Sequence, residues 1–330
     1  MYVNLYNKLK RKMKINYFKD MLESNKNNMK NLWTILKQAI GKQRNKSNLP
    51  STFTINNKQV SVKSEITESF NNYFSNIGIT TSQNIPKSKQ TYTNYLNRST
   101  GISNSIFIEP VESSYIIETA NKLKPKLSSG HDEISTKLLK ETLSEIIIPI
   151  THIINRSLES GIVPDQLKIA KVIPIYKASD PDQLRNYRPI SLLPAFSKLI
   201  EKIMYNKVMS FLNSNNSLYQ HQYGFRQKHS TIHPIIHLIN HCAKVNNANP
   251  QQYTMSIFCD LSKAFDVINH EILIKKLNFW GIRGSANKWF QNYLSGRKQY
   301  VEIDNTKSDF QNIMCGVPQG SILGTLLYVI

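Results

Sequence analysis

The segment Phe258-Cys259-Asp260-Leu261-Ser262-Lys263-Ala264-Phe265-Asp266 decides how this 330-residue chain is interpreted. Side chains alternate in character over residues 254–260, and this period of two predicts a β-strand that ends at Asp260. Residues 264–277 then read as a helix. An Asp between a strand and a helix can present a carboxylate to a hard divalent cation, although an isolated Asp at such a junction more often caps the helix.

The flanking sequence predicts mixed secondary structure. Residues 299–303 and 310–315, joined by residues 304–308, are typical of a hairpin that leads into residues 316–320. Upstream, residues 116–123 and 138–158 have helical periodicity. Residues 172–176 form a short apolar run that Pro174 should confine to an edge strand. Helices and antiparallel strands mixed in this way imply an α+β fold.

Charge predicts a polyanionic partner. The chain carries 42 Lys and Arg against 22 Asp and Glu, a formal net charge of +20. Residues 1–60 alone hold thirteen Lys and Arg against Asp20 and Glu23. Nucleic acid is the partner class that such an excess favours, while a solvated basic surface is the alternative for a single charge run.

The first 105 residues are expected to form a basic helical arm and a linker. Apolar side chains at helical spacing (Leu32, Ile35, Leu36, Ala39, Ile40) predict an amphipathic helix. Polar segments at residues 44–50 and 84–105 predict linkers. No run of about 18 apolar residues and no secretory signal occurs, so we expect an intracellular protein without a membrane span.

Two sets of possible metal ligands carry less weight. His229, His233, His237 and His241 recur every four residues, a spacing that can present zinc ligands on one helical face. Pro234 lies inside this stripe and no H-E-x-x-H pattern accompanies it, which favours a surface or core stripe. The three cysteines are far apart and predict reduced thiols.

Five ordered blocks resemble the reverse transcriptases of non-LTR (LINE-like, jockey-like) retrotransposons. They are residues 126–134 (KLSSGHDEI), 186–193 (NYRPISLL), 222–226 (QYGFR) with His229-Ser230-Thr231, the segment around Asp260, and 316–324 (GVPQGSILG). The resemblance covers about residues 122–330. It implies a right-hand polymerase whose fingers and incomplete palm occupy residues 106–330, preceded by the arm and linker of residues 1–105.

The resemblance also implies a reaction. An RNA-directed DNA polymerase extends a DNA primer on an RNA template with dNTPs, and two Mg²⁺ ions activate the attacking oxygen and neutralise the leaving pyrophosphate. Asp260 matches the first metal-binding, catalytic Asp, and the backbone carbonyl of Leu261 matches a further metal ligand. Phe265 matches the aromatic ring that excludes a ribose 2′-OH.

Three more residues are assigned by the same resemblance. Arg188 matches the fingers residue that binds the triphosphate, a role suited to a planar and always charged guanidinium. Lys177 is a second candidate for that role. Gln319 matches the residue that borders the nucleotide.

The second carboxylate pair of the family is not found in this sequence. The family places an Asp-Asp pair on a hairpin beyond residues 316–324, and no Asp-Asp dipeptide occurs here. We therefore expect that the sequence stops before that hairpin and before the thumb, and that it is inactive by itself. Asp266 should not substitute, since on a helix it would point away from Asp260.

Two functions of different classes remain open at this point. The first is a piece of an RNA-directed DNA polymerase, for which a nuclear location is compatible with the full element protein. The second is a catalytically dead retrotransposon remnant that binds RNA through its phosphates.

Overall fold

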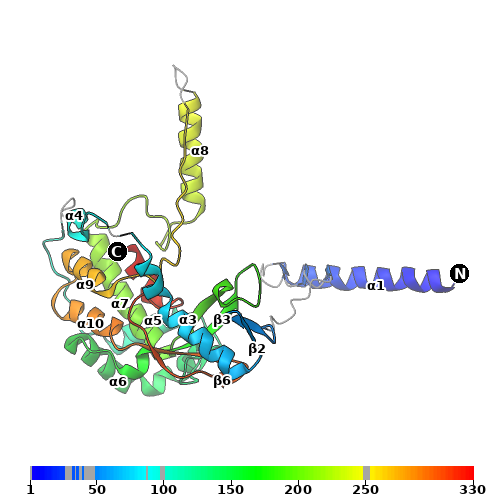
Figure 1. Ribbon diagram of the computed structural model, residues 1–330, viewed down its shortest axis with the longest axis horizontal. Coiled ribbons are helices and arrows are strands. Elements are labelled where there is room, and N and C mark those ends of the chain that lie inside the picture. Colours follow the sequence, from blue (N-terminus) through cyan, green and yellow to red (C-terminus); the bar gives the residue numbers. More distant parts are fainter. Residues whose placement is uncertain are drawn as a thin grey trace. The chain divides into compact units, whose positions relative to one another are not determined.

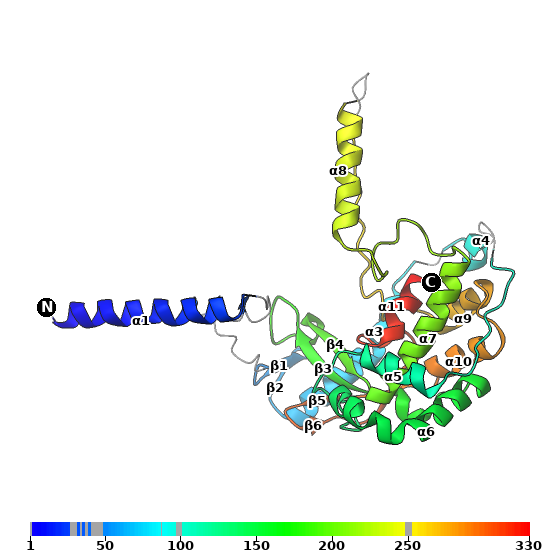
Figure 2. The same ribbon diagram turned by 180° about the vertical axis from the view of Figure 1, so that it is seen from behind.

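A computed structural model describes the chain except for residues 1, 27–31, 34, 37–38, 41–48, 87, 97–100 and 248–252. The chain divides into two compact units, Met1–Ser51 and Thr52–Ile330. Both are drawn in Figure 1, and Figure 2 shows the same ribbon from behind.

The first unit contains one long helix, α1, Tyr2–Ser24. Its described side chains are exposed or only partly buried, so no core forms along it. Leu32, Trp33, Ile35, Leu36 and Ala39 are also helical. Ile40 is an exposed turn residue, so the predicted helix ends before it. The positions between these helical residues, and most of the predicted linker at residues 44–50, lie outside the described residues.

The second unit is built on a mixed sheet in the order β4-β3-β5-β6, with β7 also paired to β5. β3 runs antiparallel to β4, with Ile173 opposite Ile190, and parallel to β5, with Lys171 opposite Tyr300. The strands are β3 Ile169–Tyr176, β4 Tyr187–Leu192, β5 Lys298–Ile303, β6 Thr306–Lys307 and β7 Gln311–Asn312.

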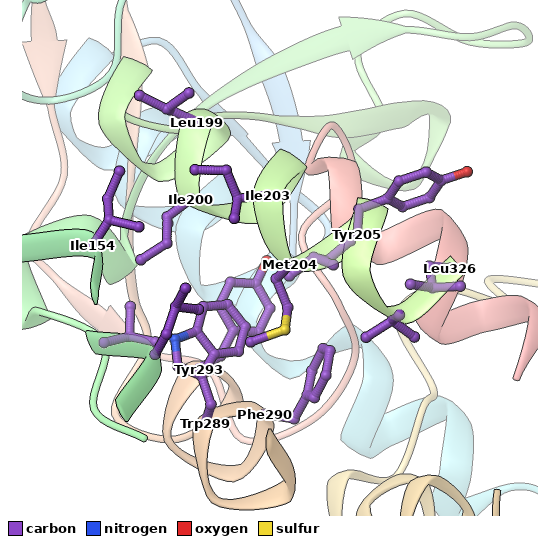
Figure 3. Close-up of a cluster of buried hydrophobic side chains, with 14 of the residues drawn as sticks. Ile154, Leu199, Ile200, Ile203, Met204, Tyr205, Trp289, Phe290, Tyr293 and Leu326 are labelled. Atoms are coloured by element: carbon purple, nitrogen blue, oxygen red, sulfur yellow. The ribbon is translucent and has the colours of Figure 1, made fainter. Parts of the chain in front are cut away.

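Helices bury the larger core. They are α5 Ser113–Asn121, α6 Thr136–Ser160, α7 Ala195–Ser214, α9 His270–Phe279, α10 Gly284–Leu294 and α11 Ile322–Val329. α7 is the central element, because side chains on several of its faces are buried. Figure 3 shows Ile200 and Met204 of α7 beside Trp289, Phe290 and Tyr293 of α10. Trp289 and Tyr293 stack with ring centroids 5.3 Å apart.

A second, aromatic core fastens α3, Lys63–Gln83, to the sheet. The ring of Phe70 contacts Phe53 (centroids 5.2 Å apart) and Tyr187 of β4 (5.1 Å). Phe53 belongs to the two-stranded sheet of β1, Phe53–Ile55, and β2, Lys58–Val60. The polymerase-like blocks therefore share one folded unit with residues that lie well upstream of them.

The expected mixture of helices and strands is confirmed, and the fold is α+β. The predicted helices at residues 116–123 and 138–158 are α5 and α6. The predicted edge strand is β3, but β3 is an interior strand over Ile169–Val172, so that expectation was wrong there. In the described ladders Pro174 pairs only with β4, so one side of the strand is without a partner there. A residue without an N–H is tolerated at such a position.

Two predictions around Asp260 were wrong. Residues 253–260 have no regular structure, and Met255, Ile257 and Phe258 are 86, 79 and 82% exposed. A strand requires a partner ladder, and no strand of the described chain pairs with this segment. The helix expected from residue 264 begins only at His270, because the Asn269 side chain accepts the Ile272 N–H (3.0 Å) and caps it.

The hairpin after β5 turns earlier than expected. Asp304 and Asn305 both have positive φ (47° and 67°), which is typical of a two-residue type I′ turn, and pairing resumes at Thr306. The predicted strand at residues 310–315 is reduced to β7.

The linker predicted at residues 84–105 is not free along its length. Residues 92–96 form the short helix α4, Tyr92–Leu96. The Arg283 guanidinium donates to the carbonyl oxygens of Ile102 (2.7 Å) and Ser103 (2.9 Å), which ties this stretch to the start of α10. The division of the chain at residue 105 stays a prediction. Among the described helices, none is long and apolar enough to cross a membrane.

Candidate functional site

Contacts join the blocks that contain Gly130, Ser191 and Gln319. A Cβ at Gly130 would lie 2.6 Å from the Pro194 nitrogen, so residues 126–134 can approach residues 186–193 only with glycine at this position. The Ser191 N–H donates to the Gln319 carbonyl oxygen (2.9 Å). The loop at residues 316–320 is therefore bound to β4.

The same loop is bound to the turn that follows Asp260. The Gly316 N–H donates to the Ile268 carbonyl oxygen (2.8 Å), and the Val317 N–H donates to the Phe265 carbonyl oxygen (2.9 Å). Gly316 has φ 79°, and a Cβ there would lie 2.7 Å from the Asp266 carbonyl oxygen. The turn and the loop thus form one rigid pair of backbone segments.

Phe265 lies in an aromatic cluster. Its ring stacks on Tyr328 of α11, with centroids 4.7 Å apart and planes 29° apart. Phe225, from the 222–226 block, meets the Phe265 ring edge-on at 5.9 Å. Lys263, two residues earlier, donates to the Tyr73 hydroxyl of α3 (2.8 Å). Two rings therefore hold the Phe265 ring, the Lys263 bond fixes the preceding turn, and all five blocks are linked by these contacts in turn.

Asp266 meets Gln319 inside this arrangement. The carboxamide nitrogen of Gln319 donates to both carboxylate oxygens of Asp266 (2.8 and 2.9 Å). Burial raises the pKa of Asp266, while the Gln319 hydrogen bond and the Lys263 ammonium lower it. No contact between Asp266 and Asp260 is recorded. We expected Asp266 to lie on a helix, but α9 begins only at His270, and Asp266 lies in the preceding turn. The sequence therefore did not predict that its carboxylate binds Gln319.

Asp260 and Leu261 lie apart from these contacts. Both are exposed on the irregular segment before the turn, and no hydrogen bond or ion pair of the Asp260 side chain is recorded among the described residues. Nowhere in the described chain do three or more His, Cys, Asp or Glu side chains gather to bind a metal ion. One carboxylate and one carbonyl do not make a donor set for two divalent ions. The described residues therefore do not fit a two-metal site.

Arg188 of β4 and Lys177, which directly follows β3, are diagonal neighbours across the β3–β4 pair. Arg188 is opposite Ile175 in the ladder, and the Lys177 N–H donates to the Asn186 carbonyl oxygen (2.8 Å). Residues directly opposite each other share a face of the sheet, so both cationic side chains lie on one face. Both are exposed. Pro189 and Ser191, which line the cleft beside Gln319, alternate with Arg188, so Arg188 and Gln319 are not brought together on one face.

A buried charged network lies next to the start of α11, directly after the loop at residues 316–320. The carboxylate of Glu201 on α7 is fully buried; it accepts the Ile322 N–H at the start of α11 (2.7 Å) and the Tyr293 hydroxyl (2.9 Å). Burial raises the pKa of Glu201, and the Arg297 guanidinium lowers it. Arg297 is also buried, donates to the Tyr293 carbonyl oxygen (3.2 Å), and its Nη2 has no partner among the described residues.

This network was missed because Glu201 sits within an apolar helical run, where a lone carboxylate gives no sequence signal of its role. The one sequence feature that could have indicated burial of Glu201 is its position between the apolar residues Ile200 and Ile203, which are buried. A charged residue in such a position is almost never fully buried unless it is paired.

Three histidines of the stripe are on α8, Ile232–Asn246, and His229 precedes this helix. Three of its imidazoles, from His229, His233 and His237, contact the ring of Tyr223 at centroid distances of 5.8, 6.2 and 5.7 Å. The stripe packs against an aromatic side chain, and the described residues give no set of metal ligands there.

Comparison with known proteins gives a consistent result. Residues 175–330 match the family described as reverse transcriptase (RNA-dependent DNA polymerase). The chain is 32% identical over 236 residues to the probable RNA-directed DNA polymerase from transposon BS of Drosophila melanogaster, covering 69% of this chain and 25% of that protein. It is 30% identical over 228 residues to the corresponding X-element protein of the same fly, covering 67% and 24%.

A third relative is the RNA-directed DNA polymerase from mobile element jockey of Drosophila funebris. The identity is 29% over 223 residues, covering 67% of this chain and 24% of the relative. The chain thus spans about a quarter of the length of the curated relatives that it matches.

Proposed function

Because residues 175–330 belong to the reverse transcriptase family and the relatives are RNA-directed DNA polymerases of non-LTR elements, we propose that this chain contributes the fingers and part of the palm of such a polymerase. Its substrates are an RNA template, a DNA primer and dNTPs. The reaction is nucleotidyl transfer to the primer 3′-OH, copying RNA into cDNA.

One observation carries the proposal: the five blocks, spread over about 200 residues of sequence, are linked by successive contacts in the folded unit. Gln319 is the point where two of these links meet, because its backbone bonds to Ser191 and its side chain to Asp266. Residues that have no reason to be adjacent in a generic α+β domain are adjacent here.

The aromatic cluster supports a steric role for Phe265. A ring that stacks on Tyr328 and meets Phe225 edge-on has little freedom to move aside. A rigid ring can exclude an additional hydroxyl, whereas a mobile one would accommodate it. We assign Phe265 to sugar discrimination, Gln319 to the border of the nucleotide site, and Arg188 with Lys177 to its phosphates.

Asp260 is proposed as a catalytic metal ligand, with the Leu261 carbonyl as a second oxygen donor, and Mg²⁺ as the metal. Two such ions would activate the attacking hydroxyl and stabilise the leaving pyrophosphate. The described residues supply only one carboxylate for this purpose.

Primer extension on an RNA template tests the proposal. In a longer protein that contains this chain together with the second carboxylate pair, Asp260→Asn should abolish Mg²⁺-dependent cDNA synthesis, because it removes a carboxylate while keeping the side chain's shape. Asp180→Asn, at another exposed Asp, is the matched control and should extend primers normally. Extension that survives Asp260→Asn would contradict the catalytic assignment.

An RNA-binding remnant without catalysis is the second candidate, favoured by the isolation of Asp260 from other carboxylates in the described chain. RNA binding without any primer extension by a longer protein that also carries the second carboxylate pair would favour this candidate over the polymerase.

A further inference from the structure

Among the proposed nucleotide-contacting residues, Gln319 is the one whose side chain is oriented by hydrogen bonds to another side chain. Its carboxamide nitrogen donates to both oxygens of Asp266, at 2.8 and 2.9 Å. Asp266 in turn is fixed by its own backbone, since its N–H donates to the Lys263 carbonyl oxygen (2.9 Å).

Two glycines allow this close arrangement. A Cβ at Gly316 would lie 2.7 Å from the Asp266 carbonyl oxygen, and a Cβ at Gly78 of α3 would lie 2.0 Å from the same atom. Both distances are too short for any side chain, so the Asp266 backbone is enclosed on two sides. The Asp266 backbone, from which the carboxylate extends toward Gln319, therefore cannot shift without disturbing α3 or the loop.

An ionised carboxylate only accepts hydrogen bonds, so it selects which end of a carboxamide faces it. The nitrogen of Gln319 faces Asp266, and the carboxamide oxygen is left directed elsewhere. Among the described residues, no donor bonds to that oxygen. Gln319 lines a cleft together with Asp266 and the exposed Lys298, so a cationic group that suits an anionic nucleotide borders the same space.

We propose that Asp266 is a positioning residue: it orients Gln319 so that the carboxamide oxygen accepts a hydrogen bond from a donor group of the bound nucleotide. This inference rests on the proposed polymerase function, because it needs Gln319 to border the nucleotide. In this role Asp266 acts through Gln319.

Asp266→Asn separates positioning from packing. The two carboxamides would then pair reciprocally, with the new side-chain nitrogen donating to the Gln319 oxygen, so the volume is kept and that oxygen is no longer free. The variant should unfold within about 2 °C of the unsubstituted protein, since the number of hydrogen bonds is preserved. Its affinity for dNTPs on a primer–template with Mg²⁺ should fall roughly tenfold, the effect of one lost hydrogen bond to a substrate.

The Gln319→Ala background shows whether the effect passes through Gln319. Gln319→Ala alone should weaken dNTP binding by a similar factor, and adding Asp266→Asn should weaken it no further. Asp304→Asn, at an exposed turn position with positive φ, is the matched control and should bind like the unsubstituted protein. An Asp266→Asn variant with unchanged affinity, or two losses that simply multiply, would overturn the proposal.

A second measurement keeps this result distinct from failure of the proposed function. In a ¹⁵N–¹H spectrum of the unliganded protein, the Gln319 side-chain amide signals should shift as Asp266 is titrated, and the shift should vanish in Asp266→Asn. Absence of dNTP binding by the unsubstituted protein would refute the nucleotide-binding function and the substrate contact with it. Amide signals that do not respond to Asp266 would refute the positioning role whatever the binding result.

Discussion

Replacing Glu201 should destabilise the protein more than replacing most residues of its core. In Glu201→Leu, the Ile322 N–H and the Tyr293 hydroxyl both lose their acceptor, and the buried Arg297 loses the nearest carboxylate that lowers its electrostatic cost. Removing one partner from a buried charge pair costs about 3–5 kcal/mol, because an uncompensated charge remains in the interior. Glu201→Gln keeps the shape and one acceptor, so its cost should be nearer about 1–3 kcal/mol.

The loss should be concentrated at the start of α11. Urea unfolding measures the free energy of unfolding, and hydrogen exchange at residues 318–324 reports whether the loop carrying Gln319 opens first. A second substitution sharpens the test: Arg297→Met in the Glu201→Leu background removes the unpaired charge and should restore part of the stability. The reasoning is refuted if Glu201→Leu costs less than 1 kcal/mol, or if Arg297→Met makes the double variant less stable still.

Three further predictions concern the sugar, the arm and pH. In a longer protein that also carries the second carboxylate pair, Phe265→Ala should admit rNTPs while dNTP incorporation continues. Single-nucleotide extension with matched dNTP and rNTP measures the sugar preference, and an unchanged preference would contradict the steric role. Residues 1–51 hold twelve Lys and Arg against two acidic residues, and their deletion leaves the buried Phe53 in place. The deletion should flatten the salt dependence of RNA binding, whose log–log slope is roughly −0.7 per phosphate contact. An unchanged slope would show that the arm does not bind RNA. Burial lowers the pKa of His270, which bonds to the Gly316 carbonyl oxygen (2.7 Å), so the unfolded chain takes up the proton first and the free energy of unfolding should fall as pH drops from about 6.5. His270→Gln should reduce this pH dependence in unfolding experiments at several pH values. An equal pH dependence in the variant would exclude His270 as its source.

Helical periodicity predicted the parts of the fold that depend on one buried face. α5 and α6 were found because each presents apolar residues at helical spacing to α7, and those residues are buried. The position of β3 in the sheet could not be found from its own residues. Its first half pairs in parallel with β5, more than 120 residues later, and only its second half, with Pro174, has the single neighbour that the sequence suggested.

The boundaries around Asp260 failed because alternation alone does not make a strand. The pattern at residues 254–260 resembles a strand with two unlike faces, yet neither face is covered in the described chain, and Ile257 and Phe258 are both exposed. The start of the next helix, α9, was predicted too early in the chain for a local reason. Apolar spacing continues back to residue 264, but Lys263 adopts φ 54° and Asn269 supplies the cap, so a turn takes the place of the first helical turns.

That turn changes what the site can do. On a helix starting at residue 264, Phe265 and Asp266 would point about 100° apart, and only one of them could reach the 316–324 loop. In the turn, the Phe265 carbonyl accepts the Val317 N–H while the Asp266 side chain binds Gln319, so adjacent residues both contact the same loop. The short stretch from Lys263 to Ile268 thereby connects the aromatic cluster to the nucleotide-bordering glutamine. A single residue inserted or deleted there should uncouple Phe265 from Gln319 even if every motif residue is kept.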